Sequence, residues 1–223
     1  MTVPLPNDDG GRMSADAGEP LHELCDRATS VAIGPGMSQS DAVQSVVVGL
    51  YSDCTRPMVV DADALNALAA HDRIPTPAGP RVLTPHIGEF RRLAGNNDLS
   101  VDDCRNAARG FAKDHQVIVV LKGHRTLVTD GSTDFENTTG NPGMATGGSG
   151  DVLTGIITAL LSQQYTPIEA AALGVHVHGL AGDMACDALG ETSMIATDLL
   201  DALPLAFKKL AAASAGGGSK MGF

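Results

Sequence analysis

The chain has 223 residues, 43% of them hydrophobic and only 3% aromatic, and it carries a formal net charge of −11 at pH 7. This length suits one large α/β domain or two small ones, and the aliphatic content is sufficient for a buried core. The negative charge argues against a nucleic-acid-binding protein, which needs a basic face, and no apolar run approaches the roughly 20 residues of a membrane span.

Short apolar runs alternate with amphipathic segments through the first half of the chain. After a polar loop at residues 2–17, we expect buried strands at residues 30–33, 58–60, 82–83 and 117–121. Helices are expected at residues 19–28, from a cap at Ser38 or Ser40 to residue 50, and at residues 64–70, 86–93 and 101–114. The run at 117–121 is continuously apolar and rich in β-branched residues, which is typical of a strand covered on both faces.

The second half of the chain contains a predicted hairpin followed by helices. Two strands at 125–129 and 133–137 flank a turn at Asp130-Gly131. A glycine-rich loop and an apolar helix follow, and a capping box from Thr166 to Glu169 starts the next helix, which reaches residue 189. The last helix, 197–210, is expected to be interrupted or restarted at Pro204. We therefore predict one domain at 1–210 and a disordered Gly-rich tail at 211–223.

Alternating strands and helices predict an α/β fold with a mostly parallel central sheet and helices on both faces, in three layers. Ligands of such sheets bind beyond the carboxyl ends of the strands. Polar residues and glycines that follow the predicted strands are therefore candidates for a site: Gly34, Gly36, Asp61, Asp63, His86, Glu89 and Lys122.

The loop at residues 137–150 and the helix after it are the strongest chemical signal in the chain. Gly147, Gly148 and Gly150 permit close approach of a ligand to the main chain, and free amides at a helix N-terminus favour an anion. Asp151 follows directly, where a base can act on a hydroxyl beside a bound phosphate. The pattern is neither a P-loop nor a dinucleotide fingerprint. The alternative is a flexible turn with Asp151 as a helix cap, worth about 1 kcal/mol.

The cysteines and the N-terminus bear on localisation. Cys25, Cys54, Cys104 and Cys186 contain no Cys-x-x-Cys pair, and residues 1–18 are polar without a hydrophobic signal segment. Widely spaced cysteines of this kind are typical of buried, reduced thiols, so we expect a cytoplasmic protein.

Seven motifs, in order along nearly the whole chain, resemble one family: the ADP- or ATP-dependent NAD(P)H-hydrate dehydratases, which have a ribokinase-like fold. The matching segments lie at residues 32–36, 60–66, 83–90, 121–126, 139–155, 178–183 and 196–204. The resemblance implies nucleotide-dependent dehydration of the S-epimer of hydrated NADH or NADPH back to the reduced dinucleotide, a metabolite repair reaction that releases phosphate and AMP or ADP. The choice between ADP and ATP is left open.

The resemblance also implies roles for individual residues. Asp151 would be the catalytic base and would contact the substrate together with Gly36 and His86, and Glu89 would organise Mg²⁺, through water. The implied nucleotide-binding residues are Lys122, Gly123, His124, Arg125, Thr126, Asn141, Gly143, Met144, Ala145, Thr146, Gly147, Gly148, Ser149 and Gly150.

The family further implies a homo-oligomer, specifically a homotetramer, that is functionally paired with an NAD(P)H-hydrate epimerase. Its members normally open with a further strand–helix–strand portion that helps to hold the substrate. The present sequence begins inside the family pattern, so we expect an exposed sheet edge and exposed apolar surface where that portion packs.

Alternatives remain open at several points. A kinase for a small alcohol, such as a thiazole or pyrimidine alcohol, would use Asp151 in the same way, and an inactive nucleotide-binding fragment is a third possibility. His86 alone could simply start a helix, and at least one of Asp61 and Asp63 is expected to be a helix cap. Lys122 is predicted about equally to pair with a carboxylate or to reach a phosphate, and His178 is expected to be a packed, supporting residue rather than a metal ligand.

Overall fold

The computed structural model describes residues 2–71 and 73–216. Its described strands form a six-stranded sheet in the order β1-β2-β3-β4-β5-β6. The strands β1 to β4 are parallel, whereas β5 and β6 are each antiparallel to the strand before them, which confirms the predicted sheet and hairpin. Their bounds are Val31–Ile33, Met58–Val60, Arg81–Leu83, Ile118–Leu121, Leu127–Thr129 and Asp134–Glu136.

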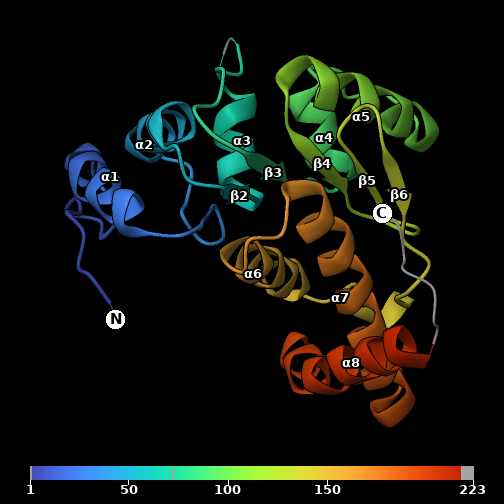
Figure 1. Cartoon of the computed structure of the whole chain (residues 1–223). Helices are drawn as coiled ribbons and strands as arrows, with labels where there is room; N and C mark the ends of the chain where they lie inside the picture. Colours follow the sequence, from blue (N-terminus) through green and yellow to red (C-terminus); the bar gives the residue numbers. More distant parts are fainter. Residues whose placement is uncertain (1, 72, 217–223) are drawn as a thin grey trace.

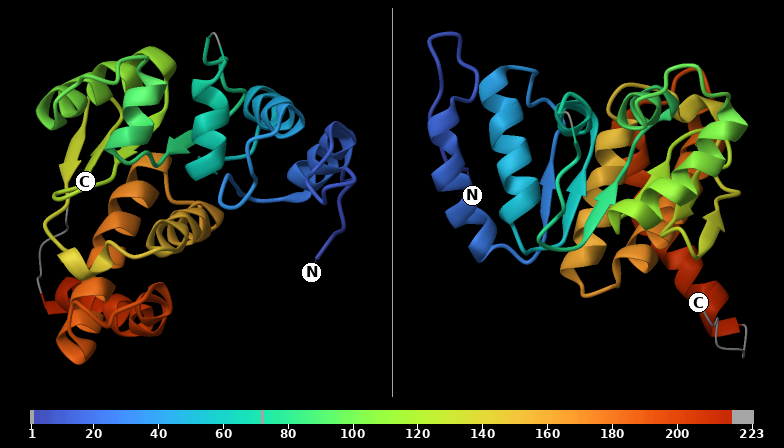
Figure 2. Two further views of the ribbon diagram at one scale, coloured as in Figure 1. Left: turned by 180° about the vertical axis from the view of Figure 1, so that it is seen from behind. Right: turned by 90° about the horizontal axis from the view of Figure 1, so that it is seen from above.

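Helices cover both faces of the sheet, as Figures 1 and 2 show. One layer holds α1 (Gly18–Arg27), α2 (Asp41–Asp53), α3 (Ala62–Ala69), α4 (Ile87–Leu93) and α5 (Val101–His115). The other holds α6 (Ser149–Ser162) and α7 (Pro167–Leu189), with α8 (Ala196–Gly216) packed on α7. Two short 3₁₀ helices, η1 (Ala15–Ala17) and η2 (Pro142–Met144), lie before α1 and before α6.

The period-2 alternation of strand side chains creates two separate cores. In β2, Met58 and Val60 join the core beneath α1 to α5, whereas Val59 joins the core with α6 and α7. All three side chains are completely buried. This is why the central strands read as continuous apolar runs rather than as alternating patterns, and it confirms the three-layer prediction.

The C-terminal region differs from the prediction. Helix α8 runs through Pro204 without interruption and continues to Gly216, so residues 211–216, expected in the disordered tail, are helical. Residues 217–223 of that predicted tail lie outside the described residues. The carbonyl that Pro204 leaves without a donor belongs to Leu200, which is exposed, so water can satisfy it. Alanines at 211–213, which have the highest helix propensity, extend the helix further.

β1 is an edge strand of the described sheet. Ala32 at its centre is exposed, so the prediction that this strand is buried was wrong for that residue. An edge strand has a neighbour on one side only, so one side of β1 has no strand partner among the described residues. Within the described residues, no helix is long and apolar enough to cross a membrane.

Candidate active site

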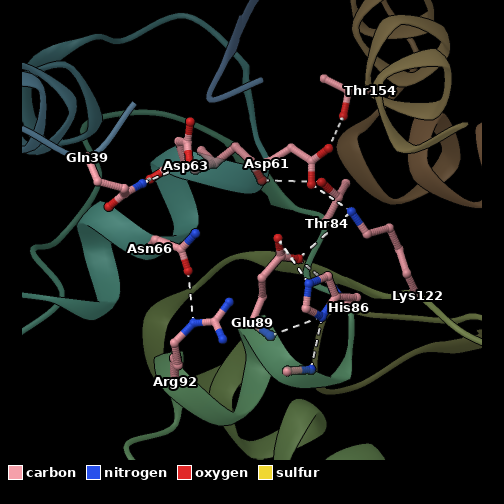
Figure 3. Close-up of polar contacts among 12 residues, drawn as sticks. Gln39, Asp61, Asp63, Asn66, Thr84, His86, Glu89, Arg92, Lys122 and Thr154 are labelled. Atoms are coloured by element: carbon pink, nitrogen blue, oxygen red, sulfur yellow. Dashed lines mark hydrogen bonds and ion pairs between the residues drawn. The ribbon is translucent and has the colours of Figure 1, made fainter. Parts of the chain in front are cut away.

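The carboxyl ends of β2, β3 and β4 bring together side chains that are far apart in sequence (Figure 3). Asp61 follows β2, and its buried carboxylate accepts hydrogen bonds from Lys122 Nζ at 2.7 Å and from Thr154 Oγ1 at 2.9 Å. Lys122 follows β4, and its backbone N–H bonds to the carbonyl of Pro85 at 2.8 Å, which extends the β3–β4 pairing. Of the two predictions for Lys122, the carboxylate pair is therefore present, while its contact with a phosphate stays a prediction.

The expectation that at least one aspartate after β2 caps a helix is met by position, but not through a side-chain hydrogen bond. Asp61 occupies the N-cap position of α3, but its carboxylate points to Lys122 and Thr154 instead. Asp63 accepts hydrogen bonds from Ser38 N at 2.7 Å and from Gln39 Nε2 at 3.0 Å. Asp61 finds a charged donor in Lys122, which binds its carboxylate more strongly than a neutral helix amide does, whereas Asp63 is bonded to the loop after β1.

The loop after β1 carries Gly36, a predicted substrate contact. Gly34, at its start, has φ +123° and lies so close to the Asp61 carbonyl that a Cβ would stand 1.7 Å from the oxygen, so only glycine fits. The loop is then tied to α3 through the bond from Ser38 to Asp63. Gly36 itself is exposed and has open space beside it, which leaves room for a ligand.

His86 and Glu89 form a capping box at the start of α4. His86 Nδ1 accepts hydrogen bonds from the N–H groups of Gly88 at 2.9 Å and Glu89 at 3.2 Å, and Glu89 Oε2 accepts from His86 N at 2.8 Å. The alternative role of His86 as a helix start is thus real. It does not exclude the substrate contact, because the His86 side chain remains 54% exposed, although its Nε2 lies 3.5 Å from Glu89 Oε1.

Glu89 does not fit as a direct metal ligand. Its carboxylate is buried, already caps α4, and lies 3.9 Å from the ammonium of Lys122. Among the described residues, no group of three His, Cys, Asp or Glu side chains is arranged to hold a metal ion. We therefore derive no step through a protein-bound metal, and the water-mediated contact of Glu89 with Mg²⁺ stays a prediction.

The N-terminus of α6 presents unpaired amides beside an exposed carboxylate. The N–H groups of Gly147, Gly148, Gly150 and Asp151 form no hydrogen bond with any residue that the structure describes. Gly148 adopts φ +87° as the N-cap, a conformation that favours glycine. The side chain of Asp151 is exposed in the first turn. The N-cap residue is Gly148, which has no side chain to cap the helix. The alternative of Asp151 as the N-cap is therefore wrong. The anion site expected at this loop stays a prediction, which the free amides support.

Helix α7 forms the platform on which the glycine-rich loop sits. A Cβ on Gly179 would stand 2.2 Å from Thr139 Oγ1, and one on Gly182 would stand 2.2 Å from Met144 Sδ. One turn after Gly179, the Asp183 carboxylate accepts hydrogen bonds from Gly140 N at 2.9 Å and from Asn141 Nδ2 at 3.0 Å. We did not predict a role for Asp183, although its motif at 178–183 was noticed, because nothing local shows that α7 lies under this loop.

His178 supports the same loop from inside the protein. Its Nε2 lies 3.0 Å from the carbonyl oxygen of Ser149 and 3.3 Å from Ser149 Oγ. Burial lowers the pKa of His178 to about 4, so the ring is neutral at pH 7 and donates from Nε2 to the carbonyl. The supporting role expected for His178 is confirmed.

The predicted nucleotide loop at 122–126 divides between two places. Lys122 reaches the Asp61 cluster, whereas Arg125 forms an ion pair with Glu136 of β6 at 2.8 Å. Thr126 Oγ1 donates to the carbonyl of Gly123 at 3.1 Å and closes the turn between them. His124 is exposed on this turn. Hydrogen bonds within the turn and the ion pair with Glu136 thus fix this loop, and Arg125 does not join the ion pair between Lys122 and Asp61.

A cavity of about 480 Å³ opens beside Asp151, between α6 and α8. Its walls are almost entirely apolar, so it does not suit a phosphate. Besides Asp151 it is lined by Val152, Gly155, Ile156, Ala159, Leu160, Gln163, Leu200, Leu203 and Phe207.

Comparison with known proteins places this geometry in a family. Residues 3–205 match the sequence model of a carbohydrate-kinase-type family described as NAD(P)H-hydrate dehydratase. The bifunctional NAD(P)H-hydrate repair enzyme Nnr of Moorella thermoacetica is 47% identical over 94% of this chain and 40% of its own length. The ADP-dependent (S)-NAD(P)H-hydrate dehydratase of Bacillus subtilis is 35% identical over 90% of this chain and 70% of its own. The chain thus spans about 40% of the length of the first bifunctional relative.

Solved structures agree with the sequence comparison. A crystal structure of the ADP/ATP-dependent NAD(P)H-hydrate dehydratase from Bacillus subtilis, grown with ATP and Mg²⁺, has a TM-score of 0.71 and 33% identity over 81% of this chain and 64% of that chain. A ribokinase-like superfamily protein from Enterococcus faecalis has a TM-score of 0.70 and 29% identity over 90% of this chain and 70% of that chain. The expected ribokinase-like fold is confirmed.

Proposed function

The chain belongs to the NAD(P)H-hydrate dehydratase family, and we propose that it uses ADP or ATP to dehydrate the S-epimer of hydrated NADH or NADPH. The products are the reduced dinucleotide, phosphate, and AMP or ADP. The observation that carries this proposal is the exposed carboxylate of Asp151 among the unpaired amides at the N-terminus of α6. That pairing suits a hydroxyl and a phosphate that meet at one point.

Asp151 serves as the general base in this scheme. Hydroxide is a poor leaving group, so the ring hydroxyl is first phosphorylated. Its oxygen attacks the terminal phosphorus, the bond from phosphorus to the nucleotide oxygen breaks, and Asp151 accepts the hydroxyl proton. The phosphate then leaves with the electrons of the C–O bond, and loss of a proton from the adjacent ring carbon to phosphate or solvent restores the double bond.

The remaining residues bind and orient the two substrates. The free amides of Gly147, Gly148, Gly150 and Asp151 face negative charge on the transferred phosphoryl group, where preorganised donors lower the barrier most. The loops at 122–126 and 141–150 hold the nucleotide. Gly36 and His86 contact the hydrated dinucleotide, and the open space beside Gly36 and the exposed ring of His86 support this.

The cellular setting is also part of the proposal. Mg²⁺ would enter with the nucleotide, because it prefers phosphate oxygens as ligands, and the Bacillus subtilis protein was co-crystallised with ATP and Mg²⁺. The protein is cytoplasmic and homo-oligomeric, with a homotetramer as the expected state. The bifunctional relatives support functional pairing with an NAD(P)H-hydrate epimerase, which would deliver the S-epimer.

One assay separates the possible activities. The purified chain is incubated with hydrated NADH and Mg²⁺, and with ADP or ATP in parallel. Return of the absorbance of reduced nicotinamide, with one phosphate released per dinucleotide, supports the proposal. A stable phosphorylated alcohol in place of NADH indicates a kinase, and calorimetric nucleotide binding without any product indicates a nucleotide-binding fragment. Either result overturns the dehydratase assignment.

A further inference from the structure

Asp61, which no step of the proposed reaction uses, joins Lys122 of the predicted nucleotide loop to Thr154 of α6 (Figure 3). Asp61 Oδ1 accepts from Lys122 Nζ at 2.7 Å, and Asp61 Oδ2 accepts from Thr154 Oγ1 at 2.9 Å. The Asp61 side chain is only 2% exposed and that of Lys122 is 21% exposed. Burying a carboxylate costs free energy unless it is paired, and well-packed apolar side chains often stabilise a core as much as a buried ion pair does. Stability alone therefore does not explain this network, and a functional role does.

The ammonium of Lys122 lies close to the unpaired amides. A Cβ built on Gly150 would stand 3.4 Å from Lys122 Nζ and 3.7 Å from Asp61 Oδ2. The Gly150 N–H is one of the free donors at this helix terminus. The positive charge therefore lies beside Gly150, whose amide is free, in the same first turn of α6 that carries Asp151.

Two carboxylates face Lys122, but they hold it unequally. Glu89 Oε2 is 3.9 Å from Nζ and is already bonded to the N–H of His86, whereas Asp61 Oδ1 is at 2.7 Å. Asp61 therefore determines where the ammonium lies. Through Thr154, one turn after Gly150, the same carboxylate is also bonded to the helix that carries Asp151.

We infer that Asp61 is a positioning residue for phosphoryl transfer, an inference that rests on the proposed function. It holds the Lys122 ammonium against the N-terminus of α6 and keeps the helix in register with it. Lys122 contacts the transferred phosphoryl group and supplies fixed positive charge there. Asp61 touches neither substrate and acts only through Lys122 and Thr154.

The kinetic test compares Asp61→Asn, Lys122→Met and the double variant in the full chain. Asp61→Asn keeps an acceptor for Thr154 but loses the charge, and displacement of a catalytic group by about 1 Å costs roughly 100-fold in kcat. Its nucleotide affinity, measured by calorimetry, is expected to stay equal or to tighten, since a negative charge is removed. Lys122→Met loses about 10²- to 10³-fold in kcat. The double variant is expected to equal Lys122→Met within about threefold, because Asp61 acts through the lysine.

The control is Thr158→Val, which removes a hydroxyl bonded only to the Thr154 carbonyl at 2.7 Å one turn further along α6, and it is expected to leave activity unchanged. If Asp61→Asn fails to fold, Thr154→Val gives the same pattern with a smaller loss, because it removes one of the two bonds to Asp61. Multiplicative losses in the double variant, or parallel losses of affinity and kcat in Asp61→Asn, would overturn the inference.

A second readout needs no catalysis. The proteins are treated with acetic anhydride, and acetylation of Lys122 is followed by peptide mass spectrometry against exposed Lys113 as an internal reference. Asp61 holds the partly buried Lys122 side chain at 2.7 Å, so loss of this charged partner frees the side chain, and Lys122 is expected to react several-fold faster in Asp61→Asn than in the wild type. Equal rates overturn the inference. Absence of turnover by the wild type ends the proposed function instead, and this arm still decides whether Asp61 holds Lys122.

Discussion

Asp151→Asn tests the proposed chemistry most directly, because it removes the base and little else. The side chain is exposed and forms no hydrogen bond with the described residues, so the substitution leaves no buried group unpaired. A positioned general base contributes about 10²- to 10⁴-fold to rate, so kcat is expected to fall by that factor. The activation barrier rises accordingly by about 3–5 kcal/mol.

Stability and nucleotide affinity are expected to respond much less. A carboxylate in the first turn of a helix interacts with the helix dipole by about 0.3–1 kcal/mol, and this is the stability that Asp151→Asn forfeits. Nucleotide affinity is expected to hold or to increase slightly, since a negative charge next to the anion site disappears. The pattern is thus a large loss in kcat with a nearly unchanged dissociation constant.

The matched control is Asp102→Asn, which removes an exposed first-turn aspartate from α5 on the opposite layer of the fold. It is expected to lose a similar few tenths of a kcal/mol and no activity. Turnover is followed by the return of reduced-nicotinamide absorbance at saturating substrate, and binding by calorimetry. If Asp151→Asn keeps more than about a tenth of the wild-type kcat, the carboxylate is not the base and the reasoning fails.

Three further predictions concern the support of the site. The pKa of His178 is lowered from 6.5 to about 4 in the folded protein, so the unfolded chain binds a proton first as the pH falls. The free energy of unfolding is therefore expected to be unaffected by His178 above pH 6.5 and to decrease by about 3 kcal/mol as the pH falls toward 4. His178→Gln should remove this part of the pH dependence in urea unfolding curves. Gly179→Ala places a Cβ 2.2 Å from Thr139 Oγ1, so it should weaken nucleotide binding at least tenfold and lower Tm. The control Gly155→Ala, whose Cβ has nothing within 4 Å, should stabilise the protein by about 0.5–1 kcal/mol. Equal Tm values for the two variants would contradict the close packing of α7 against the glycine-rich loop. Arg81→Met leaves the carbonyls of Tyr51 and Cys54 without their buried donor and should cost about 3 kcal/mol in chemical denaturation; a loss below about 1 kcal/mol would show that water replaces the guanidinium.

The elements of this fold were predictable because each is encoded in neighbouring residues. The apolar face of α2, with Val43, Val47 and Leu50 buried, follows from helical spacing, and Ser40 caps that helix as expected through a bond from Val43 N. The predicted end of α8 was wrong because a run of small residues with glycine resembles a linker. Alanines that follow an existing helix extend it readily, since each added residue gains a hydrogen bond without the cost of nucleation.

The sequence by itself determined the strand and helix pattern, the glycine-rich loop and the placement of Asp151 at a helix start, since all of these depend on local periodicity and backbone freedom. Only the tertiary structure decided which partners each polar group takes. Asp61 meets Lys122 across 61 positions and Thr154 across 93, and Asp183 reaches Asn141 across 42. A carboxylate binds whichever donor the packed sheet and helices bring within 3 Å, and no local pattern records that distance.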